Sequence, residues 1–274
     1  TVLVGSWAGK RVKTGQDFVL AGRSLPLYVV LGAVFATWFG SEAVLGIPAT
    51  FMEEGLLGIV ADPFGASLCL VLVGLFFAVK LYRKNLNTIA AYYRQRYDGR
   101  IEFLTSIAIM ISYVGWVAAQ ITALGLVFNV ISQDAVSLQH GMIIGTVIVA
   151  IYTIWGGMWS VAITDFVQMC FIIVGLLAVA VLITSKVDGG AVTVVSSAYN
   201  TGKLTMMPDL TWAGVLGFVG ALVTLGFGSI PQQDVFQRVM VAKDEQTAKK
   251  GAVMGGLMYF AFTFVPIYII FAAT

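Results

Sequence analysis

A group of polar residues interrupts the apolar stretch 27–52 where a membrane helix should be least polar. Gly40, Ser41 and Glu42 form the group, and Pro48, which weakens a helix, follows them. An opened helix exposes carbonyl oxygens that can bind a hard cation such as Na⁺, and amides that can hold an anionic group. The group therefore predicts a cavity for a polar ligand. The alternative is a kinked helix whose Ser41 and Glu42 bond to a neighbouring helix.

Asp165 is a second carboxylate inside an apolar run, and it follows the Gly156-Gly157 pair. A carboxylate within a membrane segment is costly unless it pairs or binds an ion, so Asp165 could be an ion ligand or a way-station for an ion that leaves inward. The alternative is an acid near the start of a helix, where it stabilises the helix dipole. The residues alone leave both interpretations open.

Two further features could belong to a solute cavity. Tyr113, Trp116 and Gln120 are spaced by three and four residues, so they share one face of a helix, although aromatic stripes also serve packing. Gly226 and Gly228 lie shortly before a proline and predict a second weak point in the backbone. Two broken helices that lie five helices apart are typical of a transporter built from inverted repeats.

The composition requires that these residues lie in a membrane. The 274 residues are 59% hydrophobic and 11% charged, with a mean hydropathy of +0.91. Soluble domains are about a quarter charged. Apolar runs of roughly 20 residues predict helices. Cys69 and Cys170 lie in apolar runs and are interpreted as packing residues. Because His140 is the single histidine, no histidine metal site is expected.

About seven crossings are expected within one transmembrane domain, 1–274. The chain begins at Thr1 and stops inside an apolar run at Thr274, so we expect a fragment that lacks helices at both ends. Asp62, before Pro63, is interpreted as a helix start. The expected crossings and the surface helix are 27–52, 57–81, 103–132, 141–155, 161–185, 212–230, a last one from about 251, and a surface helix at 232–250.

The basic residues predict the orientation. If the connections alternate between the two sides, one side receives fourteen of the 16 Lys and Arg, and the other receives only Lys186 and Lys203. Cytoplasmic connections carry the excess of basic residues. The connections 10–23, 80–102 and 232–250 are therefore expected to be cytoplasmic. This distribution also explains the basic residues without a nucleic-acid partner.

Several segments resemble the sodium/solute symporter family, whose members share the LeuT-type core of two inverted five-helix repeats. The resemblance covers nearly the whole chain. The segments that carry it are Phe18-Val19-Leu20-Ala21-Gly22-Arg23-Ser24, Thr88 to Tyr97, Ile151-Tyr152-Thr153-Ile154-Trp155-Gly156-Gly157-Met158-Trp159-Ser160 with Thr164-Asp165 and Gln168, and Ile230-Pro231 through Phe236-Gln237-Arg238.

The resemblance implies an ion site. The family's sodium site uses carbonyls at the break of the first core helix, which correspond to Ala36 and Phe39, and hydroxyls of the eighth core helix, which would lie beyond Thr274. In some members an acid at the position of Asp165 serves a second sodium or its inward exit. The fold class implied is an all-α membrane protein with a LeuT-type core.

The resemblance also bears on the solute. Ala36 to Gly40 is similar to the choline-transporter branch, in which the Trp that matches Trp38 belongs to an aromatic cage for a quaternary ammonium. Trp116 matches a second cage position. Two more fall on Ala66 and Gln232, which are not aromatic, so the cage is half present.

These inferences predict sodium-coupled symport of a small organic solute, cationic or zwitterionic, across the plasma (inner) membrane, with Na⁺ as the coupling ion. The alternative is the sensing domain of a symporter-like sensor kinase. An enzyme is not expected, because no nucleophile–base pair or metal motif is found. The residues expected to line the cavity are Trp38, Gly40, Ser41, Glu42, Trp116, Gln120 and Phe227.

Overall fold

A computed structural model describes residues 2–274, and within that range the chain is helical, with a single isolated bridge between Leu25 and Ala242. The helices are α1 (Val2–Gly9), α2 (Gly15–Leu20), α3 (Leu27–Trp38), α4 (Ile47–Glu54), α5 (Ala66–Leu72), α6 (Ala78–Arg83), α7 (Ile89–Arg96), α8 (Gly99–Ile131), α9 (Leu138–Thr184), α10 (Gly190–Asn200), α11 (Trp212–Gly226), α12 (Gln233–Met240) and α13 (Glu245–Ala273).

The first complete crossing is interrupted in its middle. Helix α3 ends at Trp38, and Phe39 has non-helical dihedral angles of −86° and 68°. The chain re-enters helical structure through a π-helical turn, Glu42–Gly46, which leads into α4. The polar group seen in the sequence therefore lies at the junction of two half-helices. Such unwound backbone is tolerated at membrane depth only where protein or a cavity surrounds it.

The second crossing is a series of short helical pieces. A 3₁₀ segment, Gly55–Ile59, and a π-helical segment, Val60–Gly65, precede α5, and a π-helical turn, Val73–Phe77, joins α5 to α6. Asp62 is extended within this series, with dihedral angles of −141° and 119°. Regular α-helical geometry resumes only at α5. Because the backbone at Asp62 is extended, its carboxylate can point into the molecule.

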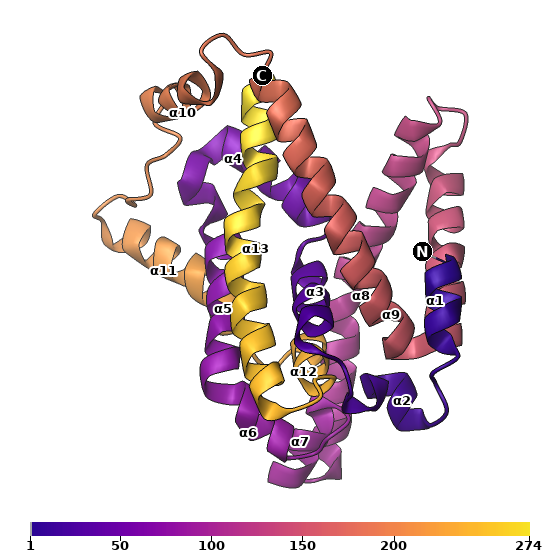
Figure 1. Cartoon of the computed structure of the whole chain (residues 1–274). Coiled ribbons are helices and arrows are strands. Elements are labelled where there is room, and N and C mark those ends of the chain that lie inside the picture. Colours follow the sequence, from indigo (N-terminus) through magenta and orange to yellow (C-terminus); the bar gives the residue numbers. More distant parts are fainter. Residues whose placement is uncertain (1) are drawn as a thin grey trace.

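Helix α9 contains the fourth and fifth crossings, which the sequence analysis expected as separate spans. The chain reverses within α9, as its two arms in Figure 1 show. The reversal lies at Gly157, whose φ of 48° and ψ of −142° are outside the helical region. A β-carbon on Gly157 would lie 2.4 Å from the carbonyl oxygen of Phe18, so only glycine fits there.

Three expectations about short segments need revision. Helix α7 forms within the connection 80–102, and α10 forms between the expected crossings 161–185 and 212–230. The segment 232–250 is divided into α12 and the first turns of α13, because the Asp244 side chain accepts a hydrogen bond from the Thr247 N–H and starts a new helix.

Helix α13 runs through the centre of the molecule, beside α5 and α3 (Figure 1). Its glycines permit close packing: a β-carbon on Gly251 or Gly255 would lie 2.6 Å from a methyl group of Val30 or Val34. The phenol of Tyr259, farther along α13, is fully buried. The centre of the fold thus joins α13 to the half-helix that carries the break.

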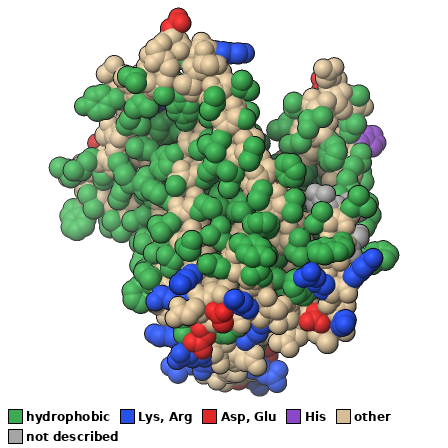
Figure 2. All heavy atoms as spheres, viewed as in Figure 1, with side chains coloured by type: hydrophobic (Ala, Val, Ile, Leu, Met, Phe, Trp, Pro, Cys, Tyr) green, Lys and Arg blue, Asp and Glu red, His purple; other side chains and the backbone are tan. Residues whose placement is uncertain are grey.

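The surface fits a membrane protein. Figure 2 shows hydrophobic side chains over the middle of the molecule, whereas Lys and Arg gather at the end that contains α2, α6, α7 and α12 in Figure 1. Four helical stretches of the described residues are long and apolar enough to span a membrane. Two of them, Glu42–Arg83 and Leu138–Thr184, include interruptions or reversals of the chain.

Candidate functional site

The break in α3 releases a backbone acceptor. The N–H of Phe39 still donates to the carbonyl oxygen of Phe35 at 2.8 Å, but the N–H of Gly40 donates to that of Trp38 at 3.0 Å. In a regular helix Gly40 would instead donate to Ala36, four residues earlier. The Ala36 carbonyl therefore leaves the helical hydrogen-bond pattern, and Phe39, at the non-helical cap, turns its own carbonyl off the axis.

Residues after the break bond to α8. The Ser41 hydroxyl donates to Oε1 of Gln120 at 2.9 Å, and the Ser41 N–H approaches the same oxygen at 3.4 Å. Gly40 lies against this amide, because a β-carbon there would be 3.1 Å from Oε1. Ser41 thus makes the inter-helix bond of the kinked-helix alternative. Gly40, Ser41 and Gln120 form one contact that lies outside the lining of the neighbouring cavity.

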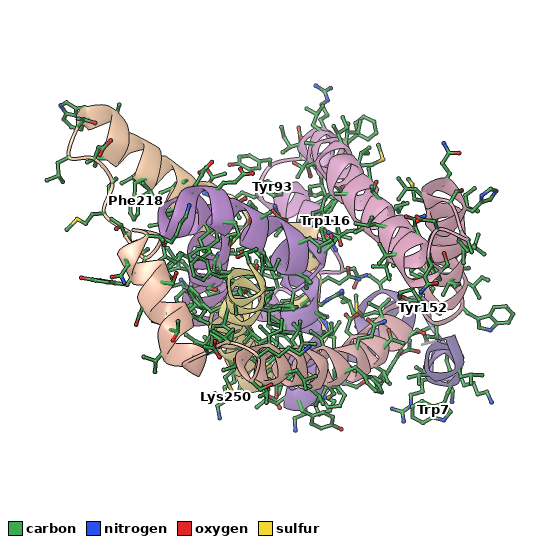
Figure 3. All side chains as sticks on the ribbon, turned by 90° about the horizontal axis from the view of Figure 1, so that it is seen from above. Trp7, Tyr93, Trp116, Tyr152, Phe218 and Lys250 are labelled. Carbon is green, nitrogen blue, oxygen red and sulfur yellow. The ribbon has the colours of Figure 1, made fainter. Side chains whose placement is uncertain are left out.

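A cavity of about 170 Å³ lies beside the break and contains Glu42 from the first crossing, Asp62 from the second and Asp234 at the start of α12. Figure 3 shows Trp116 on the inner side of α8, whereas Trp7 and Phe218 lie at the periphery. The lining residues are Thr37, Trp38, Glu42, Asp62, Ser112, Tyr113, Trp116, Leu225, Ser229, Gln232 and Asp234.

Two of the three carboxylates are held by tyrosines. The Tyr259 hydroxyl donates to Oδ1 of Asp62, and the Tyr113 hydroxyl donates to Oδ1 of Asp234. The Asp234 N–H in turn donates to the Tyr113 hydroxyl oxygen at 3.1 Å. These bonds fix the direction of both carboxylates, whereas Glu42 forms no ion pair with the described residues.

Two of the acidic lining residues were not predicted from the sequence. Asp62 was interpreted as a helix start, and Asp234 was placed in a surface helix. Neither has a local signal for its role, because each reaches the cavity through contacts with residues far away in the sequence. The pairing of Asp234 with Tyr113 spans 121 positions, and that of Asp62 with Tyr259 spans 197.

The second weak point is at the end of α11. The helix ends at Gly226, and residues 227–231 form turns that include Gly228. These turns bring Ser229 into the cavity, where its side chain is buried. The Phe227 ring does not line the cavity, and its side chain is 54% exposed on the described surface.

Asp165 lies next to Arg238 of α12, with 3.5 Å between Oδ2 and Nη2. Both side chains are largely buried, and Nε of Arg238 also donates to the Thr37 hydroxyl at 2.8 Å. Thr37 lines the cavity, so Arg238 connects Asp165 to the half-helix that carries the break. Asp165 is beyond the first turn after Gly157, where the helix-dipole effect has decreased, which disfavours the capping alternative.

The sequence is similar to those of known transport proteins. The family model described as "Sodium:solute symporter family" matches residues 18–274. High-affinity choline transporter 1 of Caenorhabditis elegans is 29% identical over 93% of this chain and 45% of its own length, and the human high affinity choline transporter 1 is 32% identical over 87% and 42%. The sodium/sialic acid symporter NanT of Aliivibrio fischeri is 28% identical over 91% and 50%.

A solved structure has the same fold. It is described as a substrate-bound outward-open state of a Na⁺-coupled sialic acid symporter, and it matches 99% of this chain and 57% of its own with a TM-score of 0.83 and 22% identity. The LeuT-type all-α fold expected from the sequence is thereby confirmed. The chain spans about half the length of the curated relatives it matches. With the family model covering nearly all of its residues, the chain belongs to the sodium:solute symporter family.

Proposed function

We propose that this chain forms part of a secondary transporter that moves a small cationic or zwitterionic solute together with Na⁺. The observation that carries the proposal is the cavity beside the α3 break, where three carboxylates meet two tryptophans. Its lining contains three carboxylates and no Lys or Arg, so the lining repels an anion. A cation instead gains from the carboxylates and from the faces of the indole rings.

The opened backbone supplies a place for Na⁺ as the second substrate. Carbonyl oxygens suit a hard cation, and the Ala36 carbonyl is released from the helical pattern. Ala36 and Phe39 are the proposed carbonyl ligands. Asp165 is proposed to assist the ion near Arg238, within reach of the same half-helix.

The named relatives support a transporter over a sensor. They are two choline transporters and a sodium/sialic acid symporter, so the family includes proteins named for a cation and for a sugar acid. In this chain the acidic lining favours the positively charged solute. The sensor-kinase alternative has no comparable observation on its side.

The connections 10–23, 80–102 and 232–250 are proposed to face the cytoplasm in the plasma membrane. Contacts on this side join segments from both halves of the chain: the Leu25 N–H donates to the Val241 carbonyl, and the Tyr82 hydroxyl donates to the Ala242 carbonyl, at 3.1 and 2.9 Å. These bonds join the two halves of the chain at the end of the molecule where the basic residues gather.

The test is uptake of radiolabelled ethanolamine by the full-length protein in proteoliposomes, with and without an inward Na⁺ gradient. We expect Na⁺ to raise the initial rate at least 10-fold. Trp38→Ala should reduce this uptake, whereas Trp212→Ala is the control, because Trp212 is 81% exposed and outside the cavity. Uptake that is equal without the gradient, or unaffected by Trp38→Ala, would contradict the proposal.

A further inference from the structure

The cavity beside the α3 break is richer in hydrogen-bond acceptors than a quaternary ammonium can use. We propose that the positive group of the solute is a primary or secondary ammonium, which carries N–H donors. This inference rests on the proposed transport function and specifies the solute that the cavity selects. It departs from the choline branch that part of the sequence resembles.

The first observation is the unused acceptor capacity of the carboxylates. Each carboxylate can accept about four hydrogen bonds. Asp62 receives a hydroxyl bond from Tyr259, and Asp234 receives one from Tyr113. Glu42 adds a third carboxylate to the same lining. An ammonium with N–H groups can donate to these oxygens, whereas the methyl groups of a quaternary ammonium would desolvate them and leave them unpaired.

The second observation is independent of the acidic residues. Ser229 is 1% exposed, lines the cavity, and its hydroxyl has no hydrogen-bond partner among the described residues. A buried polar group without a partner is rare and costs free energy, so it points to a ligand that completes it. An N–H of the solute's ammonium would supply that partner by donating to the Ser229 hydroxyl oxygen.

The third observation is the mixed character of the lining. Trp38, Tyr113 and Trp116 are its aromatic residues, but the Tyr113 hydroxyl is bonded to Asp234, and Gln232 and the three carboxylates lie beside them. A quaternary ammonium relies on aromatic faces, because it cannot donate hydrogen bonds. The amide and carboxylate oxygens among the rings are acceptors, which suit a charged donor.

The cavity volume adds a limit on size. About 170 Å³ is close to the roughly 150 Å³ of an engineered cavity that holds benzene, and it is below the range of about 300–1,000 Å³ for drug-sized ligands. This volume suits a small amine. A sugar acid such as sialic acid would bring a charge of the wrong sign to the acidic lining.

The test compares two isomeric cations on the purified full-length protein in Na⁺ buffer. Protonated valinol and choline contain the same atoms and the same charge, but only valinol has N–H donors, so their ratio separates donor chemistry from size. Displacement of labelled ethanolamine measures both affinities. We expect choline to bind at least 10-fold more weakly than valinol. Equal or tighter choline binding, or no binding by either cation, would overturn the proposal.

Two serine variants test whether the Ser229 hydroxyl forms a hydrogen bond with the solute. We expect Ser229→Ala to weaken valinol binding about 3- to 10-fold, to change choline binding little, and to leave the ligand-free protein at least as stable. Ser67→Ala is the matched control, since Ser67 is 6% exposed and its hydroxyl also has no partner, but it does not line the cavity. Equal effects of the two substitutions on valinol would contradict the assignment.

The same assay in K⁺ buffer separates this inference from the proposed function. If valinol is preferred equally in Na⁺ and K⁺ buffers, the solute assignment stands and sodium coupling fails. If binding requires Na⁺ but choline is preferred, sodium coupling stands and the solute assignment is overturned.

Discussion

Arg238 joins two proposed parts of the transport site. Its guanidinium contacts Asp165 of α9 and the hydroxyl of Thr37 in α3. Both members of the ion pair are largely buried, so water stabilises neither charge well. Each charge therefore depends on its partner more than a charge in a surface pair does. A substitution of one partner leaves the other charge without compensation, whereas a substitution of both removes the charge from the site.

We therefore expect Arg238→Gln to lower the free energy of unfolding by about 3 kcal/mol, the low end for a broken buried pair. The double variant with Asp165→Asn should recover most of that loss. Thermal unfolding in detergent measures both, and additive losses would contradict the pairing. Asp165→Asn alone should also raise the Na⁺ concentration for half-maximal uptake if Asp165 assists the ion.

The residues of the site were only partly predictable from the sequence. Glu42 and Trp116 could be assigned to a cavity from the residues around them, and Trp38 from the resemblance to the choline-transporter branch. Asp62 and Asp234 could not, because tyrosines far along the chain position them. Phe227 was assigned from its place beside the second break, but the turn that follows α11 brings Ser229 inward instead.

Among the helices, α9 depends on a single residue for its reversal. The positive φ of Gly157 lies at the turn between the two arms, against the Phe18 carbonyl. We expect Gly157→Ala to lower the free energy of unfolding by about 1–3 kcal/mol or more, through backbone strain and the steric clash. Gly175→Ala in the same helix is the control.

A β-carbon on Gly175 would meet no atom within 4 Å, and alanine is the better helix former by about 1 kcal/mol. Gly175→Ala should therefore leave the melting temperature unchanged or raise it. A comparable loss for both variants would show that the reversal does not require glycine at 157.

We expect the start of α2 to be sensitive to acid. Hydrogen bonds from the Thr14 side chain and the Lys13 N–H hold the pKa of the Asp17 carboxyl below its ordinary value of 3.8. The stabilisation is fully present above that ordinary value and is lost as pH falls through the lower folded-state pKa. We expect Asp17→Ala to lower the melting temperature at pH 7, and the difference to shrink at pH 3. A difference independent of pH would contradict the role of the charge.

Long helices were more predictable than short ones. The apolar runs that became α8, α9 and α13 are long enough to span a membrane, and the length of such a run can be read directly from the sequence. Helices α7 and α10 lie in polar connections, and their formation depends on caps and tertiary contacts that a short segment does not reveal. The interruption of the first crossing was predictable because glycine, proline and charge coincide there.

For the molecule as a whole, the distribution of basic residues predicts which end faces the cytoplasm. Figure 2 shows that Lys and Arg gather at one end of the molecule, which agrees with this prediction of two unequal sides. We test the orientation in a background with Cys69→Ala and Cys170→Ala. A membrane-impermeant maleimide applied to intact cells should label Lys203→Cys and leave Arg96→Cys unlabelled until the cells are opened. The reverse pattern would invert the proposed topology.

Sodium-coupled symport of a cation through the acidic cavity is tested most directly by accumulation under an imposed membrane potential. A cation moving with at least one Na⁺ carries at least two charges, each contributing about 2.3 kcal/mol per 100 mV. With equal Na⁺ on both sides and an inside-negative potential from a thiocyanate gradient, proteoliposomes should accumulate labelled valinol above its external concentration. The same potential in K⁺ salts should give little accumulation. Equal accumulation in both salts, or none in Na⁺, would contradict the account.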